Sequence, residues 1–243
     1  MTQPPTILYG DFSCPWTYLA HRRLALLRTV GDTFELRAVE HEPWRAVVAT
    51  SPADEFEDLR GELDRVRSYL LPGEDLPEVL RGFVPHTRAA VSGFGEAYGG
   101  GVADIVGPML FDAFWRHGLD LDDPVVVRTL VADAIQSGCS PSDPLRRWGH
   151  AVAVTGGPMT TLAWRLVRAW RQEWTSMDKQ VVPVLVLPDG AVRYGTEAVE
   201  HLGREVLDRG LDPGTELVWP EPGPRPPVDG YGRAQVLYPL DVA

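Results

Sequence analysis

The chain has 243 residues, of which 44% are hydrophobic and 23% charged, and its net charge at pH 7 is −11. This length and composition can bury a sizeable core, and the acidity argues against nucleic acid or an anionic membrane as the partner. No apolar run approaches the roughly 18–20 residues that span a bilayer. Residues 1–5 lack the basic and apolar segments of a secretory signal, so a cytoplasmic location is expected.

Residues 6–39 carry a β-α-β pattern. Residues 6–12 are a short apolar run followed by turn residues, which predicts a buried strand. Apolar residues between positions 16 and 27 recur at helical spacing, which predicts a helix that ends near Gly31. Residues 34–39 predict a second strand, and a unit of this kind places its two strands parallel.

A long segment of helical character follows, from residue 51 to residue 175. Helices are predicted over residues 54–71, 87–98, 105–117, 124–137 and 160–174. Asp122 or Asp123 is the expected N-cap of the fourth, because Pro124 suits the first helical position. Ten of the 22 aromatic side chains of the chain fall in these helices, and they are expected to pack a helical core.

The β pattern returns late in the chain. Residues 181–187 form a β-branched run, residues 188–190 form a turn, and residues 191–194 continue, which predicts a hairpin. Pro183 cannot donate to a strand ladder, and a cis bond at the start of the strand would account for it. A final helix is predicted through Arg209 with Thr196 as its N-cap. Residues 211–243 are a proline-rich tail, expected to be an extended arm.

The chain has two cysteines, Cys14 and Cys139, and six histidines. No disulfide framework is expected in a chain of this length without an export signal. No Cys-x-x-Cys or His-x-x-x-His spacing occurs, so no metal site is predicted. Cys139 lies in a turn-like stretch and is interpreted as incidental.

Cys14 is the candidate catalytic residue, because it stands where the first strand passes into a helix that begins with Pro15. Unpaired N–H groups and the helix dipole favour a thiolate there, which predicts a lowered pKa for Cys14. Asp11 is either an assisting buried carboxylate or a turn residue, and His41 either assists proton transfer or is a solvated loop histidine. His21 is expected to be exposed.

Three stretches resemble the DsbA-like branch of the thioredoxin superfamily, and most of all its FrnE-type oxidoreductases. They are Asp11-Phe12-Ser13-Cys14-Pro15-Trp16-Thr17-Tyr18-Leu19-Ala20, Val181-Val182-Pro183-Val184 and Gly195-Thr196-Glu197-Ala198-Val199. The resemblance implies an α/β, thioredoxin-like fold (βαβ…ββα) with a large all-helical insertion. The thioredoxin-like domain would comprise residues 5–50 and 176–210, the inserted helical domain residues 51–175, and the C-terminal tail residues 211–243.

One departure from that family bears on mechanism, since Thr17 stands where its oxidoreductases carry a second cysteine. The resemblance then implies a monothiol enzyme, in which Thr17 stabilises the Cys14 thiolate. A low-molecular-weight thiol, glutathione or mycothiol, would resolve the mixed disulfide that Cys14 forms with a small-molecule or protein disulfide. A homodimer is the expected assembly.

Kappa-class glutathione transferases and 2-hydroxychromene-2-carboxylate isomerases suggest an alternative, a thiol-dependent transferase or isomerase. There the cofactor thiol would be the nucleophile, polarised by Thr17 or Cys14. Val182 and Pro183 would hold its cysteinyl part, and Thr196 and Glu197 its amino-acid end. Trp16, Trp44, Phe111 and Trp115 are candidates for an apolar wall over the substrate or for core packing. A third alternative is a non-catalytic thioredoxin-like module that binds a partner.

Overall fold

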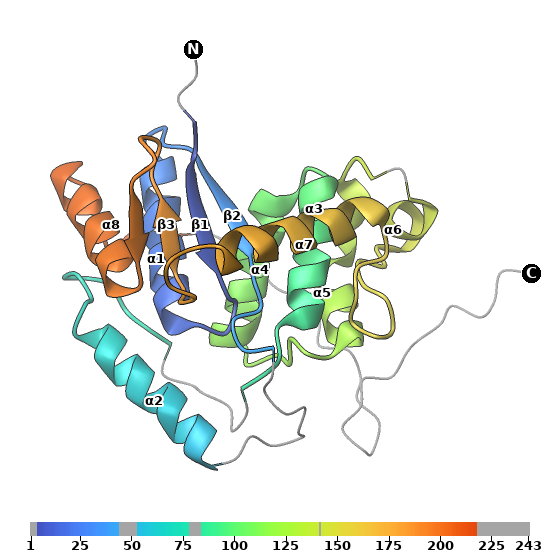
Figure 1. Cartoon of the computed structure of the whole chain (residues 1–243), viewed down its shortest axis with the longest axis horizontal. Helices are drawn as coiled ribbons and strands as arrows, with labels where there is room; N and C mark the ends of the chain where they lie inside the picture. Colours follow the sequence, from blue (N-terminus) through green and yellow to red (C-terminus); the bar gives the residue numbers. More distant parts are fainter. Residues whose placement is uncertain (1–3, 44–52, 78–83, 141, 218–243) are drawn as a thin grey trace, which may run out of the picture.

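A computed structural model describes residues 4–43, 53–77, 84–140 and 142–217. Within them, a four-stranded sheet has the order β2-β1-β3-β4 (Figure 1). The strands are β1 Thr6–Gly10, β2 Phe34–Ala38, β3 Val184–Val186 and β4 Val192–Tyr194. β1 is parallel to β2 and antiparallel to β3, which forms an antiparallel hairpin with β4. The predicted β-α-β unit and the late hairpin are both confirmed.

All four strands are shorter than predicted, and β1 and β3 lose two or more residues at an end where a backbone carbonyl accepts from a helix side chain. The carbonyl of Phe12 accepts from Trp115 Nε1 at 2.9 Å, so β1 ends at Gly10. The carbonyl of Val181 accepts from Trp174 Nε1, also at 2.9 Å. Residues 181–183 therefore form a loop, and the β3 ladder begins at residue 184.

Helices cover both faces of the sheet. On one face lie α1 (Pro15–Arg28) and α4 (Ala103–Trp115), which meet where the rings of His21 and Phe111 lie 4.7 Å apart. On the other face lies α7 (Thr161–Thr175), where Glu173 accepts a hydrogen bond from the hydroxyl of Tyr9 at 2.8 Å. The last helix, α8 (Thr196–Asp208), packs beside α1.

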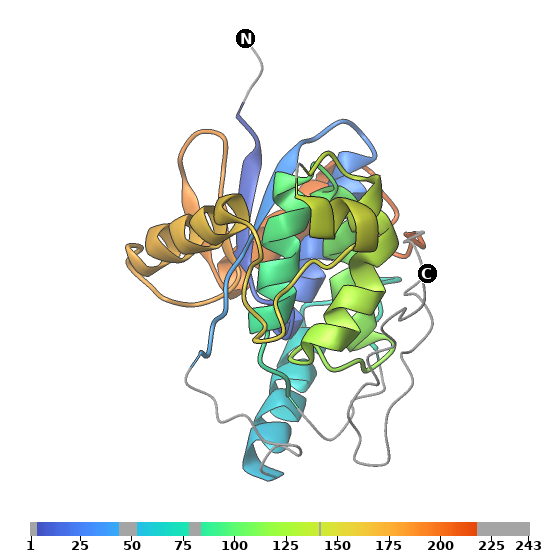
Figure 2. The ribbon, with the colours of Figure 1, turned by 90° about the vertical axis from the view of Figure 1, so that its right-hand side faces the viewer.

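The remaining helices are α2 (Ala53–Arg67), α3 (Arg88–Gly99), α5 (Pro124–Ser137) and α6 (Asp143–Trp148). Asp123, one of two predicted N-caps, caps α5, and its carboxylate accepts from the amide of Val125 at 2.7 Å. α6 was not predicted from the sequence, since its six residues are too few to show a helical period. Figures 1 and 2 both show α2 at the lower edge of the molecule.

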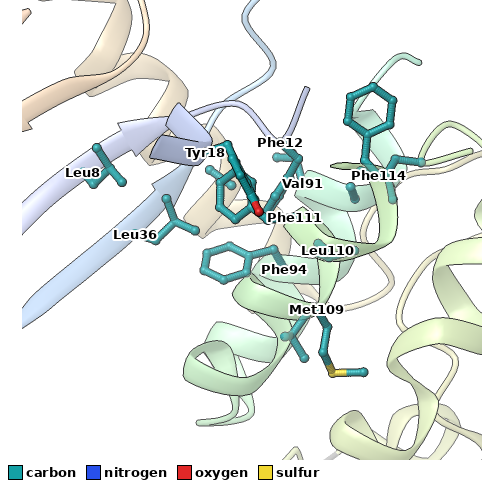
Figure 3. Close-up of a cluster of buried hydrophobic side chains, with 14 of the residues drawn as sticks. Leu8, Phe12, Tyr18, Leu36, Val91, Phe94, Met109, Leu110, Phe111 and Phe114 are labelled. Carbon is teal, nitrogen blue, oxygen red and sulfur yellow. The ribbon is translucent and has the colours of Figure 1, made fainter. Parts of the chain in front are cut away.

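One continuous core joins the sheet to the helical segment (Figure 3). Phe12 lies at its centre, with its ring centroid 5.8 Å from that of Phe94 and 4.9 Å from that of Phe111. His21 is 3% exposed, so the prediction that it is exposed is wrong, because α4 covers this face of α1. The division into two domains and a tail stays a prediction, and residues 218–243 of the tail lie outside the described residues.

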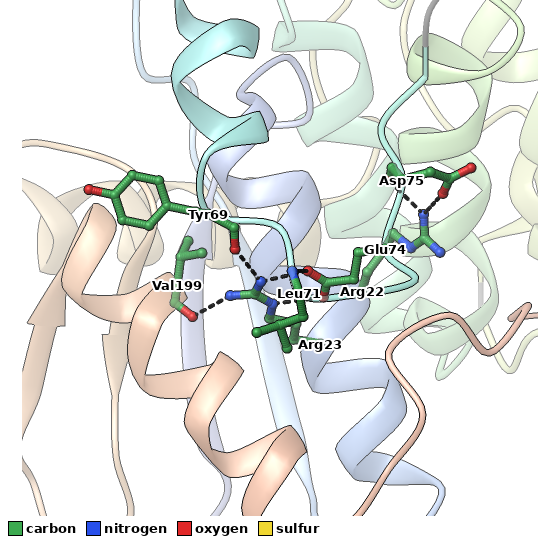
Figure 4. A network of polar contacts seen from close by, with 7 residues as sticks. All are labelled: Arg22, Arg23, Tyr69, Leu71, Glu74, Asp75 and Val199. Carbon is green, nitrogen blue, oxygen red and sulfur yellow. Dashed lines mark hydrogen bonds and ion pairs between the residues drawn. The ribbon is translucent and has the colours of Figure 1, made fainter.

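A buried ion pair fixes the segment that follows α2 (Figure 4). The guanidinium of Arg23 on α1 contacts both carboxylate oxygens of Glu74, at 2.8 and 2.6 Å, and the two side chains are 1% and 4% exposed. Arg23 also donates to the carbonyls of Tyr69 and Val199 at 2.7 Å each. This arginine therefore joins α1, α8 and the chain leaving α2, which ends at Arg67 and not at residue 71 as predicted.

Candidate active site at Cys14

Cys14 lies at the junction that the sequence predicted. It is the N-cap residue of α1, with extended backbone angles, and Pro15 is the first helical residue. Its sulfur lies 3.8 Å from the carbonyl oxygen of Val182, to which the thiol donates. The Val182–Pro183 peptide bond is cis, and the amide of Gly195 donates to the carbonyl of Pro183 at 2.8 Å. The thiol therefore faces a backbone loop that is tied to the start of α8.

Asp11 holds the active-site turn in place. One carboxylate oxygen accepts from the amide and the hydroxyl of Ser13, both at 3.0 Å. The other oxygen accepts from the amide of His41 at 2.7 Å. Asp11 is 3% exposed, so it is a buried carboxylate that fixes both the turn before Cys14 and the loop after β2.

Burial raises the pKa of the Cys14 thiol to about 12, and the carboxylate of Glu62 adds to the rise. The hydroxyl and amide of Thr17 oppose it, because both can donate to the ionised sulfur. The predicted lowering of this pKa is therefore wrong. The start of α1 favours a thiolate, but the loss of water around the sulfur and the negative charge of Glu62 on α2 outweigh it.

Thr17 lies beneath the surface and not on the wall of the site. It is 0% exposed, and its hydroxyl has no hydrogen-bond partner among the described residues. A buried hydroxyl without a partner costs free energy. Because Thr17 is one of the groups that lower the pKa of Cys14, its unused donor is available to the sulfur when the thiol ionises.

A polar pocket of about 550 Å³ opens beside Cys14. Asp11, Cys14, Trp16, His41 and Val182, all singled out from the sequence, contribute to its wall. The rest of the lining is dominated by charged and polar groups, namely Ser13, Glu40, Glu42, Asp58, Glu62, Arg65, His86 and Thr87, with Leu59, Val84 and Pro85. Carboxylates outnumber the single arginine, so the pocket is acidic.

The residues predicted at the start of α8 do not line this pocket. The N-cap of α8 is Gly195, with φ 54° and ψ −120°, and not Thr196 as predicted. This backbone geometry suits glycine, because a positive φ is unfavourable for residues with a Cβ atom. Thr196 and Glu197 are exposed, and Glu197 lines a separate hollow with Arg193, Glu200 and Arg204.

The predicted aromatic wall is only partly present. Trp16 lines the pocket, and its ring packs at 5.1 Å against that of Tyr69. Phe111 and Trp115 are 2% and 0% exposed and belong to the core, which was the other interpretation of them. Trp44 lies outside the described residues.

Among the pocket residues that were not singled out from the sequence, His86 and Thr87 carry buried polar atoms. The Nδ1 atom of His86 lies 3.4 Å from a carboxylate oxygen of Glu40, and its Nε2 atom is buried without a hydrogen-bond partner among the described residues. The neighbouring hydroxyl of Thr87 is also buried without a partner there. No motif marks this Pro-His-Thr segment, since it reaches Cys14 only through the tertiary fold.

The described part of the chain contains no group of three His, Cys, Asp or Glu side chains that could hold a metal ion. None of its helices is long and apolar enough to cross a membrane.

No protein-family model matches the sequence, and no curated protein matches it significantly. Solved structures do match. A probable DsbA oxidoreductase from Streptomyces coelicolor is 17% identical, with a TM-score of 0.58 over 88% of this chain and 93% of that one. A 2-hydroxychromene-2-carboxylate isomerase is 20% identical, with a TM-score of 0.55 over 85% of this chain and 96% of that one. The chain therefore has the thioredoxin-like fold of DsbA-like proteins, as its sequence motifs predicted.

Proposed function

We propose that the protein is a thiol-disulfide oxidoreductase that uses Cys14 alone, with a low-molecular-weight thiol as its resolving partner. The observation that carries the proposal is the position of the Cys14 sulfur, which lines an open polar pocket and lies 3.8 Å from the carbonyl of Val182. No other cysteine of the described residues lines this pocket, and Cys139 is exposed elsewhere.

The reaction takes two exchange steps. The sulfur of Cys14 attacks a disulfide, forms a mixed disulfide with one half and releases the other half as a thiol. A second thiol then attacks the mixed disulfide and regenerates Cys14. Thr17 stabilises the transient thiolate through its buried hydroxyl, and the backbone of Val182 beside Pro183 orients the sulfur of the partner.

The charge of the pocket favours one class of small thiol. Glutathione carries two carboxylates and one ammonium group, so it is a net anion that the acidic lining would repel. Mycothiol carries an uncharged sugar portion, whose hydroxyls can donate to carboxylates such as Asp58 and Glu62. We therefore propose mycothiol, or another uncharged hydroxyl-rich thiol, as the cosubstrate. The mixed disulfide on Cys14 should then form faster from the disulfide of this thiol than from oxidised glutathione.

The alternative function is a thiol-dependent transferase or isomerase. It is favoured by the thiol of Cys14 being largely protonated, because its pKa is raised to about 12 and it donates to a carbonyl. A protonated thiol can polarise a bound cofactor sulfur without forming a bond to it. In this case Cys14 would hold and polarise the cofactor sulfur and would form no mixed disulfide.

A disulfide-reduction assay separates the two functions. The substrate is 2-hydroxyethyl disulfide, the reductant is the small thiol, and the variants are Cys14→Ser and Cys139→Ser. The oxidoreductase proposal predicts that Cys14→Ser loses the protein-dependent rate and that Cys139→Ser retains it. A rate that survives in Cys14→Ser would contradict the proposal and favour the alternative.

A further inference from the structure

The Glu40–His86 pair in the wall of the pocket has no part in the two exchange steps described so far. His86 comes from the segment before α3 and Glu40 from the loop after β2, so the fold brings them together across 46 positions of sequence. The His86 side chain is 9% exposed and that of Glu40 is 16% exposed. Both line the same pocket as Cys14.

The pairing sets the chemistry of the imidazole. A carboxylate only accepts hydrogen bonds, so Nδ1 of His86 carries the hydrogen that faces Glu40. In the neutral ring, Nε2 then presents a lone pair. This atom is buried and has no partner among the described residues, although it belongs to a residue that lines the pocket. An oriented base with an unused lone pair is the arrangement that general-base catalysis requires.

We propose that His86, oriented by Glu40, accepts the proton of the small thiol that resolves the mixed disulfide on Cys14. This inference rests on the proposed oxidoreductase function. The hydroxyl of Thr87, also buried without a partner among the described residues, is placed to hold a polar group of the same thiol.

The exchange balances with no further reactant. Nε2 takes the proton from the incoming thiol, and the resulting thiolate attacks the outer sulfur of the mixed disulfide. The disulfide bond breaks, and its electron pair goes to the sulfur of Cys14. The imidazolium then returns the proton to that sulfur through water in the pocket. One disulfide is formed and one is broken, so the proton has only been moved.

The environment of Cys14 explains why a proton carrier is useful. A leaving thiol with a raised pKa departs slowly unless it is protonated, and the pKa of Cys14 is raised by its burial. Several charged groups lie near His86. They are Glu40 in contact with it, Asp122 within electrostatic reach, and the other pocket residues Asp11, His41, Glu42, Asp58, Glu62 and Arg65.

The test follows the release of a preformed adduct in the full chain carrying Cys139→Ser. The adduct of Cys14 with 2-mercaptoethanol is made from 2-hydroxyethyl disulfide, and excess 2-mercaptoethanol then removes it. Intact mass measured against time gives the release rate between pH 5 and pH 9. The variants are His86→Gln, Glu40→Gln and, as the matched control, His201→Gln, whose histidine lines a different hollow.

The proposal predicts that His86→Gln slows release at pH 7 by about 100-fold, within the usual range for a general acid–base group. The release rate of His86→Gln should also rise about tenfold per pH unit, because the uncatalysed reaction follows the thiolate fraction of the incoming thiol. Glu40→Gln should slow release less, and His201→Gln should match the parent protein. If His86→Gln does not fold, Glu40→Gln and its pH profile decide the question.

Equal rates and equal pH profiles in the parent and His86→Gln would overturn the inference and leave the oxidoreductase function standing. Failure of the parent protein to form any adduct on Cys14 is a different result, since it would overturn the proposed function and this inference with it.

Discussion

The sulfur of Cys14 and the carbonyl oxygen of Val182 lie 3.8 Å apart, although 168 positions separate the two residues in the chain. This contact joins the start of α1 to the loop before β3. It places the thiol against the backbone of Val182, which lines the same acidic pocket.

The first prediction concerns the two side chains with opposite effects on the pKa of Cys14. In a Cys139→Ser background, Glu62→Gln should speed alkylation of Cys14 by iodoacetamide at pH 8, because it removes a charge that raises this pKa. Thr17→Val should slow alkylation, because it removes a hydroxyl that stabilises the thiolate. Thr17→Ser keeps the hydroxyl and serves as the control. Alkylation that is equally fast in all four proteins would contradict the assignment.

The second prediction concerns Gly10, which leaves room for Thr17. A Cβ atom at position 10 would lie 2.1 Å from the Cγ2 atom of Thr17 and 3.1 Å from its hydroxyl oxygen. Gly10→Ala should therefore displace Thr17, lower the free energy of unfolding by about 1–3 kcal/mol and reduce disulfide-reduction activity.

Thr17→Ser removes the clashing methyl group, so the double variant with Gly10→Ala should recover stability and activity. Urea denaturation and the reduction assay measure both. A double variant no better than Gly10→Ala alone would show that the contact with Thr17 is not the cause.

The third prediction concerns the acid stability of the fold. Burial lowers the pKa of His21 from its ordinary value of 6.5 to about 3. Between pH 6.5 and about pH 3, His21 binds a proton in the unfolded chain but not in the folded chain. The folded state is therefore fully stable with respect to this group above pH 6.5, and it loses stability as the pH falls below that value. The loss between pH 7 and pH 5 should be about 2 kcal/mol.

His21→Phe keeps a ring against Phe111 and cannot titrate. The free energy of unfolding in urea, measured at pH 7 and pH 5, should fall about 2 kcal/mol less in this variant than in the parent. An identical fall in both proteins would mean that His21 titrates normally and is not shielded from water.

The fourth prediction concerns the buried pair of Arg23 and Glu74. Arg23→Met should lower the free energy of unfolding by about 3–5 kcal/mol, because it leaves the carboxylate of Glu74 buried without its partner. Adding Glu74→Leu should recover part of the loss. The exposed pair of Arg28 and Asp104 is the matched control, and Arg28→Met should cost less than about 1 kcal/mol. If the two arginine variants lost the same free energy of unfolding, burial of the Arg23–Glu74 pair would not be the reason for its effect.

Local patterns in the sequence predicted the elements of the fold well. The strand, the turn with Cys14 and the helix that starts at Pro15 are adjacent in the chain, and each carries its own signal in apolar spacing or helix-start chemistry. The hairpin and the helix capped by Asp123 were predicted for the same reason. The length of β3 could not be predicted, because Trp174 at the end of α7 donates to the carbonyl of Val181, and the apolar pattern of residues 181–187 gives no sign of that hydrogen bond.

The environment of Cys14 was harder to predict than its position. The start of α1 favours a thiolate, but the carboxylate of Glu62 on α2 raises the pKa of Cys14. No local sequence pattern predicts that these two residues lie close together. His86 and Glu40 are likewise distant from Cys14 in sequence, and each looks like an ordinary loop residue until the fold places both in one pocket. Pairings of this kind depend on tertiary packing, which spacing along the chain does not reveal.

The most direct test of the account is the intact mass of the protein after incubation with oxidised mycothiol and, separately, with oxidised glutathione. The account predicts one adduct, located at Cys14 by peptide mapping, absent in Cys14→Ala and formed faster from mycothiol disulfide. An adduct confined to Cys139, or no adduct from either disulfide, would contradict the claim that Cys14 forms a mixed disulfide with a small thiol.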